Sequence, residues 1–204
     1  MTIFGHGKII RELLTQRDMT GLFFGSFNPL HNGHLGIAHY ILDKHLCDEV
    51  WFIVSPKNPL KKDMELLDEH KRKEMLEVAT ASDHRIRVSD IEFKMPRPSY
   101  TIDTLEVLSD QYPEKQFALI MGEDNLKNFH LWKEYQKISS HYPILVYPRP
   151  GIECPEVSYP NVTRIDAPLS PVSSTDIRLK LKNGESVAPY VPASILDMVI
   201  DHYA

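Results

Sequence analysis

Short apolar runs alternate along the chain with longer segments of helical periodicity. Residues 49–54 and 117–121 are almost wholly apolar, which is typical of strands buried on both faces of a parallel sheet. Further strands are predicted at residues 20–25, 86–88, 91–93, 142–147 and 162–165. Gly122 and Pro148 directly follow two of these runs, so the runs predict strands that end in turns.

The segments between the runs carry apolar residues three and four positions apart. Residues 33–45 are the clearest example, with Leu35, Ile41 and Leu42 on one side of the predicted helix. Other helices are predicted at residues 8–16, 68–81, 100–112, 173–183 and 192–203. Strands that alternate with helices indicate a parallel sheet with right-handed crossovers. The predicted fold is therefore α/β, a Rossmann-like, doubly wound parallel sheet with C-terminal helices.

Length and composition narrow the classes of protein. A chain of 204 residues suits one α/β domain, and we expect an N-terminal extension over residues 1–19, forming a short helix, and a single domain over residues 20–204. The net charge of -5 argues against a general nucleic-acid binder, and no apolar run approaches the roughly 20 residues of a membrane span. Cys47 and Cys154 form no C-x-x-C pair, so we expect a reducing, cytoplasmic location and no disulfide framework.

Residues 25–34, Gly-Ser-Phe-Asn-Pro-Leu-His-Asn-Gly-His, lie where a predicted strand passes into a predicted helix. A helix N-terminus presents free N–H groups and the positive end of the helix dipole, which together bind anions. His31 and His34 are three residues apart and can face one ligand, while Gly33 allows the backbone to approach a phosphate closely. Two other readings are structural histidines and a zinc site, but the latter lacks a third ligand nearby.

A second candidate anion site lies near the C-terminus. Ser173, Ser174 and Thr175 can cap the next helix and leave N–H and hydroxyl donors for an anion. Arg178 lies one turn further on the same face, where its guanidinium can bind phosphate oxygens in a bidentate manner. The alternative is an ordinary helix cap followed by a solvated arginine.

These segments resemble a known superfamily. Residues 25–34 resemble the (H/T)-x-G-H signature of the nucleotidyltransferases, and residues 172–178 resemble their second signature, I-S-S-T-x-I-R. The segments 98–105, 121–125, 131–135 and 147–151 are similar to segments of bacterial nicotinate-nucleotide adenylyltransferases. The sequence departs from that pattern at Phe24, Asn28 and Pro148 and in the lysine-containing loop at residues 58–62.

The resemblance implies adenylyl transfer from ATP to nicotinate mononucleotide, giving deamido-NAD⁺ and pyrophosphate. It implies three catalytic residues, His31, His34 and Arg178. Its ATP-binding residues are Gly25, Ser26, Phe27, Gly33, His34, Gly122, Asp124, Arg149, Ser173, Ser174, Thr175 and Arg178. Its nicotinate mononucleotide-binding residues are Ser26, Tyr100, Thr101, Trp132 and Lys133. Mg²⁺ is expected to arrive bound to ATP, with no metal site formed by the protein alone.

Several alternatives remain open at this stage. Trp132 can be a half-buried core aromatic, and Arg149 can simply cover the sheet edge. Lys57, Lys61 and Lys62 can either steer a triphosphate or be solvated. The phosphate acceptor can instead be nicotinamide mononucleotide, phosphopantetheine or, in a cytidylyl transfer, glycerol phosphate. A nucleotide-binding sensor without catalytic activity is the alternative from another class. The sequence does not indicate an oligomeric state.

Overall fold

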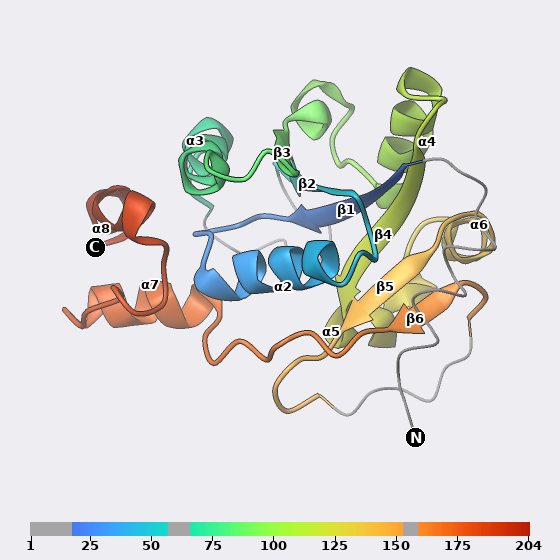
Figure 1. The fold of residues 1–204 in the computed structure, drawn as a ribbon. Helices are drawn as coiled ribbons and strands as arrows, with labels where there is room; N and C mark the ends of the chain where they lie inside the picture. The colour runs from blue at the N-terminus through green and yellow to red at the C-terminus, as the bar shows by residue number, and fades with distance from the viewer. Residues whose placement is uncertain (1–17, 57–65, 153–158) are drawn as a thin grey trace.

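The structure is a computed structural model that describes residues 18–56, 66–152 and 159–204. Its centre is a six-stranded parallel sheet in the order β3-β2-β1-β4-β5-β6 (Figure 1). The strands are β1 (Met19–Gly25), β2 (Glu49–Val54), β3 (Ile86–Ser89), β4 (Gln116–Gly122), β5 (Ile144–Tyr147) and β6 (Val162–Arg164). From β1, the strands β2 and β3 follow one another toward one edge of the sheet, and from β4, the strands β5 and β6 follow toward the other edge. The strand order therefore reverses between β1 and β4, where ligands bind in sheets of this type.

Alternate residues of each strand point to opposite faces of the sheet and form two apolar cores. Phe23 and Phe52 belong to the first core, and their neighbours Leu22 and Trp51 belong to the second. The strands carry apolar side chains on both faces, which explains why the sequence shows continuous apolar runs rather than alternation.

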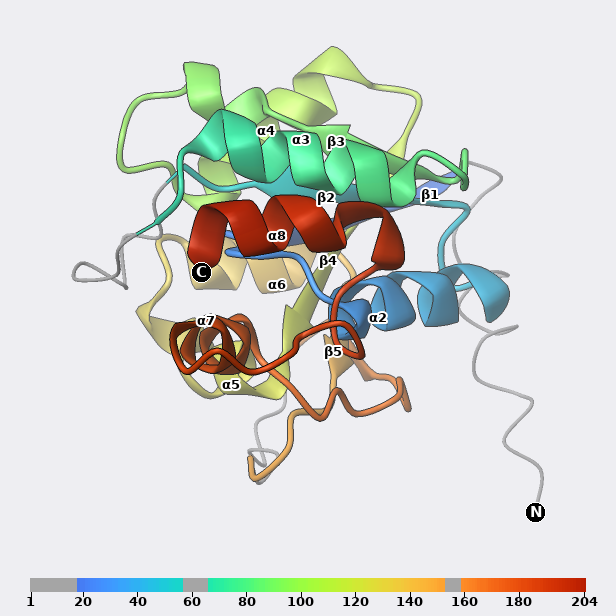
Figure 2. The same ribbon diagram turned by 90° about the vertical axis from the view of Figure 1, so that its left-hand side faces the viewer.

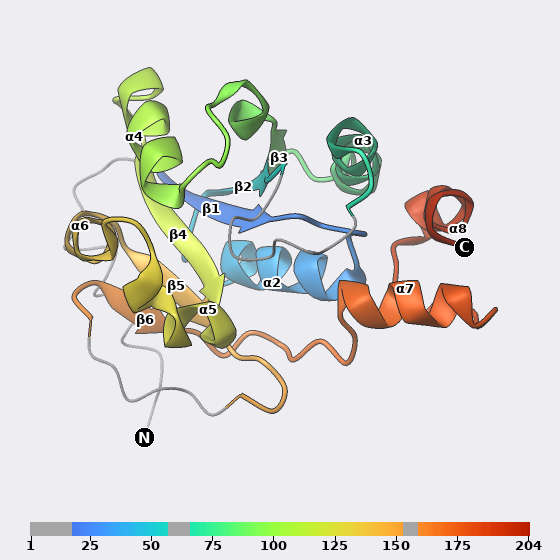
Figure 3. The same ribbon diagram turned by 180° about the vertical axis from the view of Figure 1, so that it is seen from behind.

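Helices cover both cores. The first core is covered by α2 (Asn32–Asp43), α3 (Glu69–Thr80), α7 (Ser174–Lys182) and α8 (Leu196–Tyr203), which Figure 2 shows from their own side. The second core is covered by α4 (Thr101–Gln111), α5 (Glu123–Lys127) and α6 (Tyr135–His141), seen from behind in Figure 3. Short 3₁₀ turns lie at η2 (Ile91–Lys94), η3 (Phe129–Leu131) and η4 (Ala193–Ile195). The doubly wound α/β fold predicted from the sequence is confirmed.

Most predicted elements agree with the structure to within two residues, but one strand was predicted wrongly. Residues 91–93 form the 3₁₀ turn η2, with the N–H of Phe93 donating to the carbonyl of Asp90 at 2.9 Å. Ile91 packs on the second core and Phe93 on the first, while Glu92 between them is buried. The apparent alternation thus came from a buried polar residue, Glu92, whose carboxylate accepts hydrogen bonds from the hydroxyls of Ser99 and Thr104. The helices α5 and α6 were not predicted, and the helix predicted at residues 8–16 lies outside the described residues.

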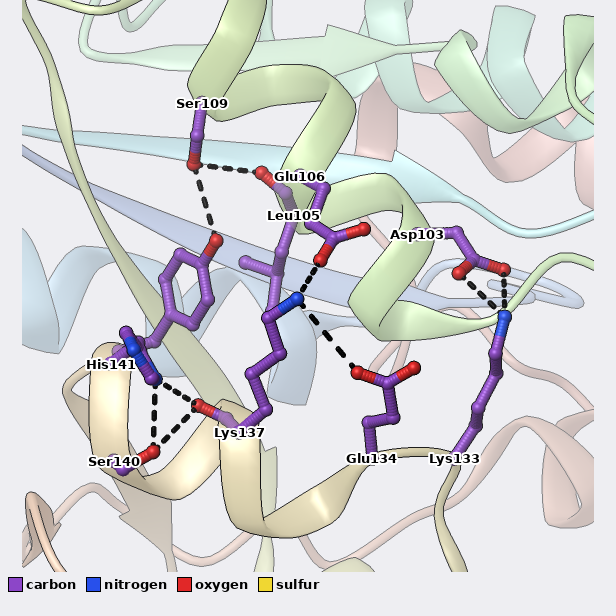
Figure 4. A network of polar contacts seen from close by, with 10 residues as sticks. Asp103, Leu105, Glu106, Ser109, Lys133, Glu134, Lys137, Ser140 and His141 are labelled. Atoms are coloured by element: carbon purple, nitrogen blue, oxygen red, sulfur yellow. Dashed lines mark hydrogen bonds and ion pairs between the residues drawn. The ribbon is translucent and has the colours of Figure 1, made fainter.

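A polar network joins α4 to α6 over the second core (Figure 4). Lys133 donates to both carboxylate oxygens of Asp103, at 2.7 and 2.9 Å. Lys137 pairs with Glu106 on α4 and lies 3.8 Å from Glu134. These pairs are solvent-exposed and contribute little to stability, so α4 and α6 are held together mainly by their apolar side chains in the second core, such as Leu105 and Ile138.

Within the described residues, no helix is both long enough and apolar enough to cross a membrane.

Candidate active site

A pocket of about 170 Å³ opens at the carboxyl ends of β1 and β4, where the strand order reverses. It draws on four parts of the chain: the end of β1 and the turn into α2, the start of α5, the end of β5, and the start of α7. Its lining residues are Phe23, Phe24, Gly25, Ser26, Phe27, His31, His34, Asp124, Asn125, Tyr147, Arg149, Ser173, Ser174, Thr175 and Arg178.

The turn between β1 and α2 is held rigidly by its own side chains. Phe27 has a φ of +46°, in the left-handed region that a bulky residue rarely adopts. Its ring is buried and meets the rings of Phe52 and His34 edge-on, each at 5.1 Å between centroids. Packing of this aromatic ring offsets the strain of its backbone, so the chain enters α2 in one defined path.

The two histidines of this turn form a stacked pair. Their ring centroids are 3.7 Å apart, with 27° between the planes. The backbone N–H of His31 donates to Nδ1 of His34 at 3.2 Å. Because Nδ1 of His34 accepts this bond, the proton of the neutral ring lies on Nε2, which makes Nε2 a donor.

Both rings are neutral at pH 7. Burial is the main cause that lowers the pKa of His31 from 6.5 to about 4; nearby Arg149 contributes in the same direction and Asp176 in the opposite one. Burial, the neighbouring His31 and Arg149 hold the pKa of His34 well below its usual value. Nδ1 of His31 is buried and has no hydrogen-bond partner among the residues that the structure describes. A buried polar atom of this kind is costly unless a ligand or water satisfies it, so the pair is suited to contact one.

The N-terminus of α7 reaches the pocket through a capping box. Ser173 accepts from the N–H of Asp176 at 3.2 Å, and the Asp176 carboxylate accepts from the N–H of Ser173 at 2.8 Å. The hydroxyls of Ser173 and Ser174 donate to Asp176 and to the carbonyl of Pro29, at 2.7 and 2.8 Å. The expectation that these two hydroxyls are left for an anion is wrong in this structure, because protein groups already accept from them. The N-terminal end of the helix still faces the pocket.

Arg178 ties α7 to the turn after β1. Its Nη1 donates to the carbonyl of Asn28 at 2.6 Å, and its Nη2 donates to the hydroxyl of Thr175 at 3.2 Å. Tyr203, in α8, donates to the side-chain oxygen of the same Asn28 at 2.7 Å. The arginine lines the pocket, and it also joins two segments that are 150 residues apart.

Another part of the pocket lining is built around Arg149. Its Nε donates to Asp124 at 3.3 Å and its Nη2 to the Tyr147 hydroxyl at 3.1 Å, and its guanidinium lies over the Tyr147 ring. A Cβ added at Gly122 would come within 2.4 Å of the Asp124 carboxylate and 3.0 Å of the Arg149 Nε. Gly122 therefore leaves the space in which this pair sits, although it does not line the pocket itself.

The absence of a side chain at Gly33 was predicted to let the backbone approach a phosphate, but in the structure it leaves room for Ser170. A Cβ added there would lie 2.3 Å from the Ser170 hydroxyl oxygen and 2.4 Å from its Cβ. In this structure the close approach at Gly33 is therefore made by the chain leading into α7.

The residues predicted to bind nicotinate mononucleotide lie apart from this pocket, except Ser26. Tyr100 is the N-cap of α4, and Lys133 lies over its ring at 5.1 Å while paired with Asp103. Thr101 is the first residue of α4. Trp132 is partly buried and meets the ring of Phe129 edge-on at 5.5 Å. Its position fits the half-buried core aromatic that was the alternative, and no observation tests binding by these four residues.

Sequence reasoning missed four residues that line the pocket, namely Phe23, Phe24, Asn125 and Tyr147. Asn125 and Tyr147 lie within segments that the sequence did single out, residues 121–125 and 147–151, at the carboxyl ends of β4 and β5, but neither was named as a site residue. The rule that ligands bind beyond the ends of parallel strands therefore identifies both. The two phenylalanines of β1 carried no such signal, since apolar strand residues normally belong to the core.

The described residues contain no group of three or more His, Cys, Asp or Glu side chains arranged to hold a metal ion.

The protein has a doubly wound parallel sheet with a pocket at the point where the strand order reverses. Neutral histidines, arginines and a helix N-terminus surround this pocket. These features define an α/β protein of the nucleotide-binding type. A family model described as cytidylyltransferase-like matches residues 22–180. A probable nicotinate-nucleotide adenylyltransferase of Flavobacterium johnsoniae is 46% identical over 185 residues, covering 89% of this chain and 95% of that protein. A protein of the same name from Bacteroides fragilis is 43% identical over 185 residues, covering 90% and 92%. The chain therefore belongs to the cytidylyltransferase-like family and, within it, to the nicotinate-nucleotide adenylyltransferases.

Solved structures with the same fold share less sequence. The nicotinic acid mononucleotide adenylyltransferase of Plasmodium falciparum, complexed with NaAD, matches with a TM-score of 0.72 and 18% identity, covering 91% of this chain and 94% of that chain. The same protein complexed with APC matches with a TM-score of 0.69 and 17% identity, again covering 91% and 94%. At this level of identity the likeness concerns the fold.

Proposed function

We propose that this protein transfers the adenylyl group of MgATP to nicotinate mononucleotide, giving deamido-NAD⁺ and pyrophosphate. Its relatives at 39–46% identity carry the name of this activity and are covered over most of their length. The observation in the structure that carries the proposal is the pocket at the switch point. It gathers the neutral histidine pair, Arg149, Arg178 and the N-terminus of α7 around one space.

The chemistry needs no covalent intermediate. An oxygen of the acceptor phosphate forms a bond to the α-phosphorus of ATP, the bond from that phosphorus to the bridging oxygen breaks, and pyrophosphate leaves with its electrons. Enzymes accelerate such transfers chiefly by positioning the reactants and stabilising charge. In this assignment Nε2 of His34 donates to an oxygen of the α- or β-phosphate. His31, stacked on His34, holds the same phosphates.

The two arginines that line the pocket come from different parts of the chain, Arg149 from the end of β5 and Arg178 from α7, and we assign them to different parts of the nucleotide. Arg178 and the N-terminus of α7 hold the pyrophosphate that leaves, because helix dipole and guanidinium both favour anions there. Arg149, with Asp124 and Gly122, bounds the adenosine side. Mg²⁺ belongs to the substrate in this proposal, where it neutralises part of the triphosphate charge.

A pyrophosphate-release assay with a panel of acceptors tests the proposal. The panel contains ATP with nicotinate mononucleotide, nicotinamide mononucleotide or phosphopantetheine, and CTP with glycerol phosphate. We expect turnover with nicotinate mononucleotide, and a preference over the nicotinamide form on the order of 10- to 1000-fold, since donors that match a carboxylate leave an amide NH₂ unpaired.

Two results of the panel contradict the proposal in different ways. No release with any acceptor would favour a nucleotide-binding sensor without activity. Equal kcat/KM on the two mononucleotides would remove the nicotinate preference and leave adenylyl transfer standing.

We also propose a cytoplasmic location, which the use of cysteine in the sequence leads us to expect. Fractionation of cells that produce the protein tests it.

A further inference from the structure

Glu92 is a buried carboxylate that the proposed chemistry does not use. It lies in the 3₁₀ turn after β3 and is 2% exposed. Ser99 donates to its Oε2 at 3.0 Å and Thr104 to its Oε1 at 2.9 Å. The hydroxyl of Ser55 forms a third hydrogen bond to the same carboxylate. Three hydroxyl groups, from Ser55 and from the segment that contains Ser99 and Thr104, therefore donate to the carboxylate of Glu92.

Two of these partners enclose the start of α4. Ser99 and Thr104 lie on either side of Tyr100 and Thr101, two residues that the family resemblance assigns to the acceptor nucleotide. Ser99 is 8% exposed and Thr104 is fully buried, so Thr104 cannot contact a substrate. Their bonds to Glu92 fix the turn from residue 99 to residue 104 on the rest of the fold.

The third partner, Ser55, is hydrogen-bonded to residues of the pocket at the switch point, which is called the phosphate pocket from here on. The N–H of Ser55 donates to the carbonyl of Gly25 at 2.9 Å, and its carbonyl accepts from Nη1 of Arg72 at 3.0 Å. Arg72 is 1% exposed, and the same Nη1 also donates to the carbonyl of Ser26, a residue that lines the pocket. Hydrogen bonds thus run without interruption from Gly25 and Ser26, through Ser55, to Glu92 and the start of α4.

We infer that Glu92 is a positioning residue that sets the turn before α4, and with it the acceptor nucleotide, at a fixed distance from the phosphate pocket. The inference rests on the proposed function, because it concerns the acceptor of that reaction. An in-line transfer needs its two substrates in near-attack geometry, and an error of about 1 Å in their placement can lower the rate on the order of 100-fold.

A carboxylate suits this task better than an apolar side chain would. It accepts all three hydroxyl bonds at once, whereas a leucine would remove the acceptor that the three hydroxyls share. Burial raises the pKa of Glu92, and the three hydroxyl donors counteract this effect because they favour the ionised form. The network is therefore satisfied by its own members and holds a single arrangement.

The sharpest test uses two substitutions of the buried Thr104. Thr104→Val keeps the shape but removes the hydroxyl, and Thr104→Ser keeps the hydroxyl. We expect Thr104→Val to raise the KM for nicotinate mononucleotide about tenfold and to leave the KM for ATP within about twofold. Thr104→Ser should stay within about twofold of wild type for both. Glu106→Gln, an exposed carboxylate on the same helix, is the matched control and should change neither KM.

The outcomes separate positioning from a merely structural role. A lower melting temperature in Thr104→Val with both KM values unchanged would overturn the inference. Ser99→Ala provides a second measurement at the same carboxylate if Thr104→Val fails to fold, and it should show the same selective rise in KM. Wild-type protein that releases no pyrophosphate with nicotinate mononucleotide would overturn the proposed function and this inference with it. Normal wild-type turnover with unaffected variants would overturn the inference alone.

Discussion

Acid should destabilise this protein through His31. The folded protein holds the ring neutral with a pKa of about 4, while the unfolded chain has the ordinary value of 6.5. Between these two values the unfolded state binds more protons than the folded state, so the free energy of unfolding falls as the pH falls. The stabilising contribution is fully present above pH 6.5 and is lost as the pH approaches 4.

The size of the effect follows from the shift in pKa. Each pH unit in this range removes about 1.4 kcal/mol. At about pH 5 the loss attributable to His31 is therefore about 2 kcal/mol, and it approaches about 3 kcal/mol at pH 4. His34 adds to the loss with the same sign, because its pKa is also lowered.

Urea unfolding at about pH 7.5 and pH 5, for wild type and for His31→Asn, measures this contribution. Asparagine does not titrate and is a good N-cap residue, so the variant keeps a capped α2. We expect wild type to lose about 2 kcal/mol more than the variant between the two pH values. Replacing His31 also removes its lowering effect on the pKa of His34, so both changes make the variant lose less stability than wild type. Equal losses in the two proteins would therefore refute the reasoning.

Three further predictions concern activity. His34→Ala removes the Nε2 donor and should lower kcat about 10²- to 10³-fold at saturating substrates, so retention of more than about a tenth of the wild-type kcat would contradict its role. Arg178→Lys keeps the charge but loses the second Nη group, and we expect kcat/KM for ATP to fall roughly tenfold or more without loss of secondary structure by circular dichroism. An unchanged kcat/KM would remove Arg178 from the phosphate site. Gly122→Ala should raise the KM for ATP several-fold, because its Cβ would press on Asp124 and Arg149, and an unaltered KM would exclude that pair from ATP binding.

The sheet could be predicted because its strands are buried on both faces and therefore appear as continuous apolar runs. Helix α2 was equally predictable, since its apolar residues recur at helical spacing and cover one core. The start of α5 carried little signal, because Glu123–Lys127 is short and contains a single buried residue, Leu126. Helix α6 begins after Glu134, a residue with a φ of +50°, and nothing in the local sequence requires that conformation.

The pocket at the switch point was predictable to the extent that many of its lining residues stand in compact motifs at strand ends. The capping of α7 by Ser173 also follows from the local sequence. What the hydroxyls of Ser173 and Ser174 bind could not be predicted, because one acceptor is the carbonyl of Pro29, 145 residues away. The partners of Glu92 were hidden although Ser99 and Thr104 are only 7 and 12 residues away, because no local pattern shows that these side chains meet. A carboxylate in a polar loop looks exposed until the fold brings three hydroxyls to it.

The bonds of Asn28 to Arg178 and Tyr203 have a consequence for the order of events during protein synthesis. The turn that contains Asn28 leaves the ribosome early, while its partners in α7 and α8 emerge 150 and 175 residues later. A growing chain therefore contains some of the residues that line the pocket long before it contains those of α7, and because a domain folds as a unit the pocket is completed only late. Ribosome-bound chains halted before residue 173 should gain no protection from protease when ATP is added, whereas chains that have released α8 should gain it.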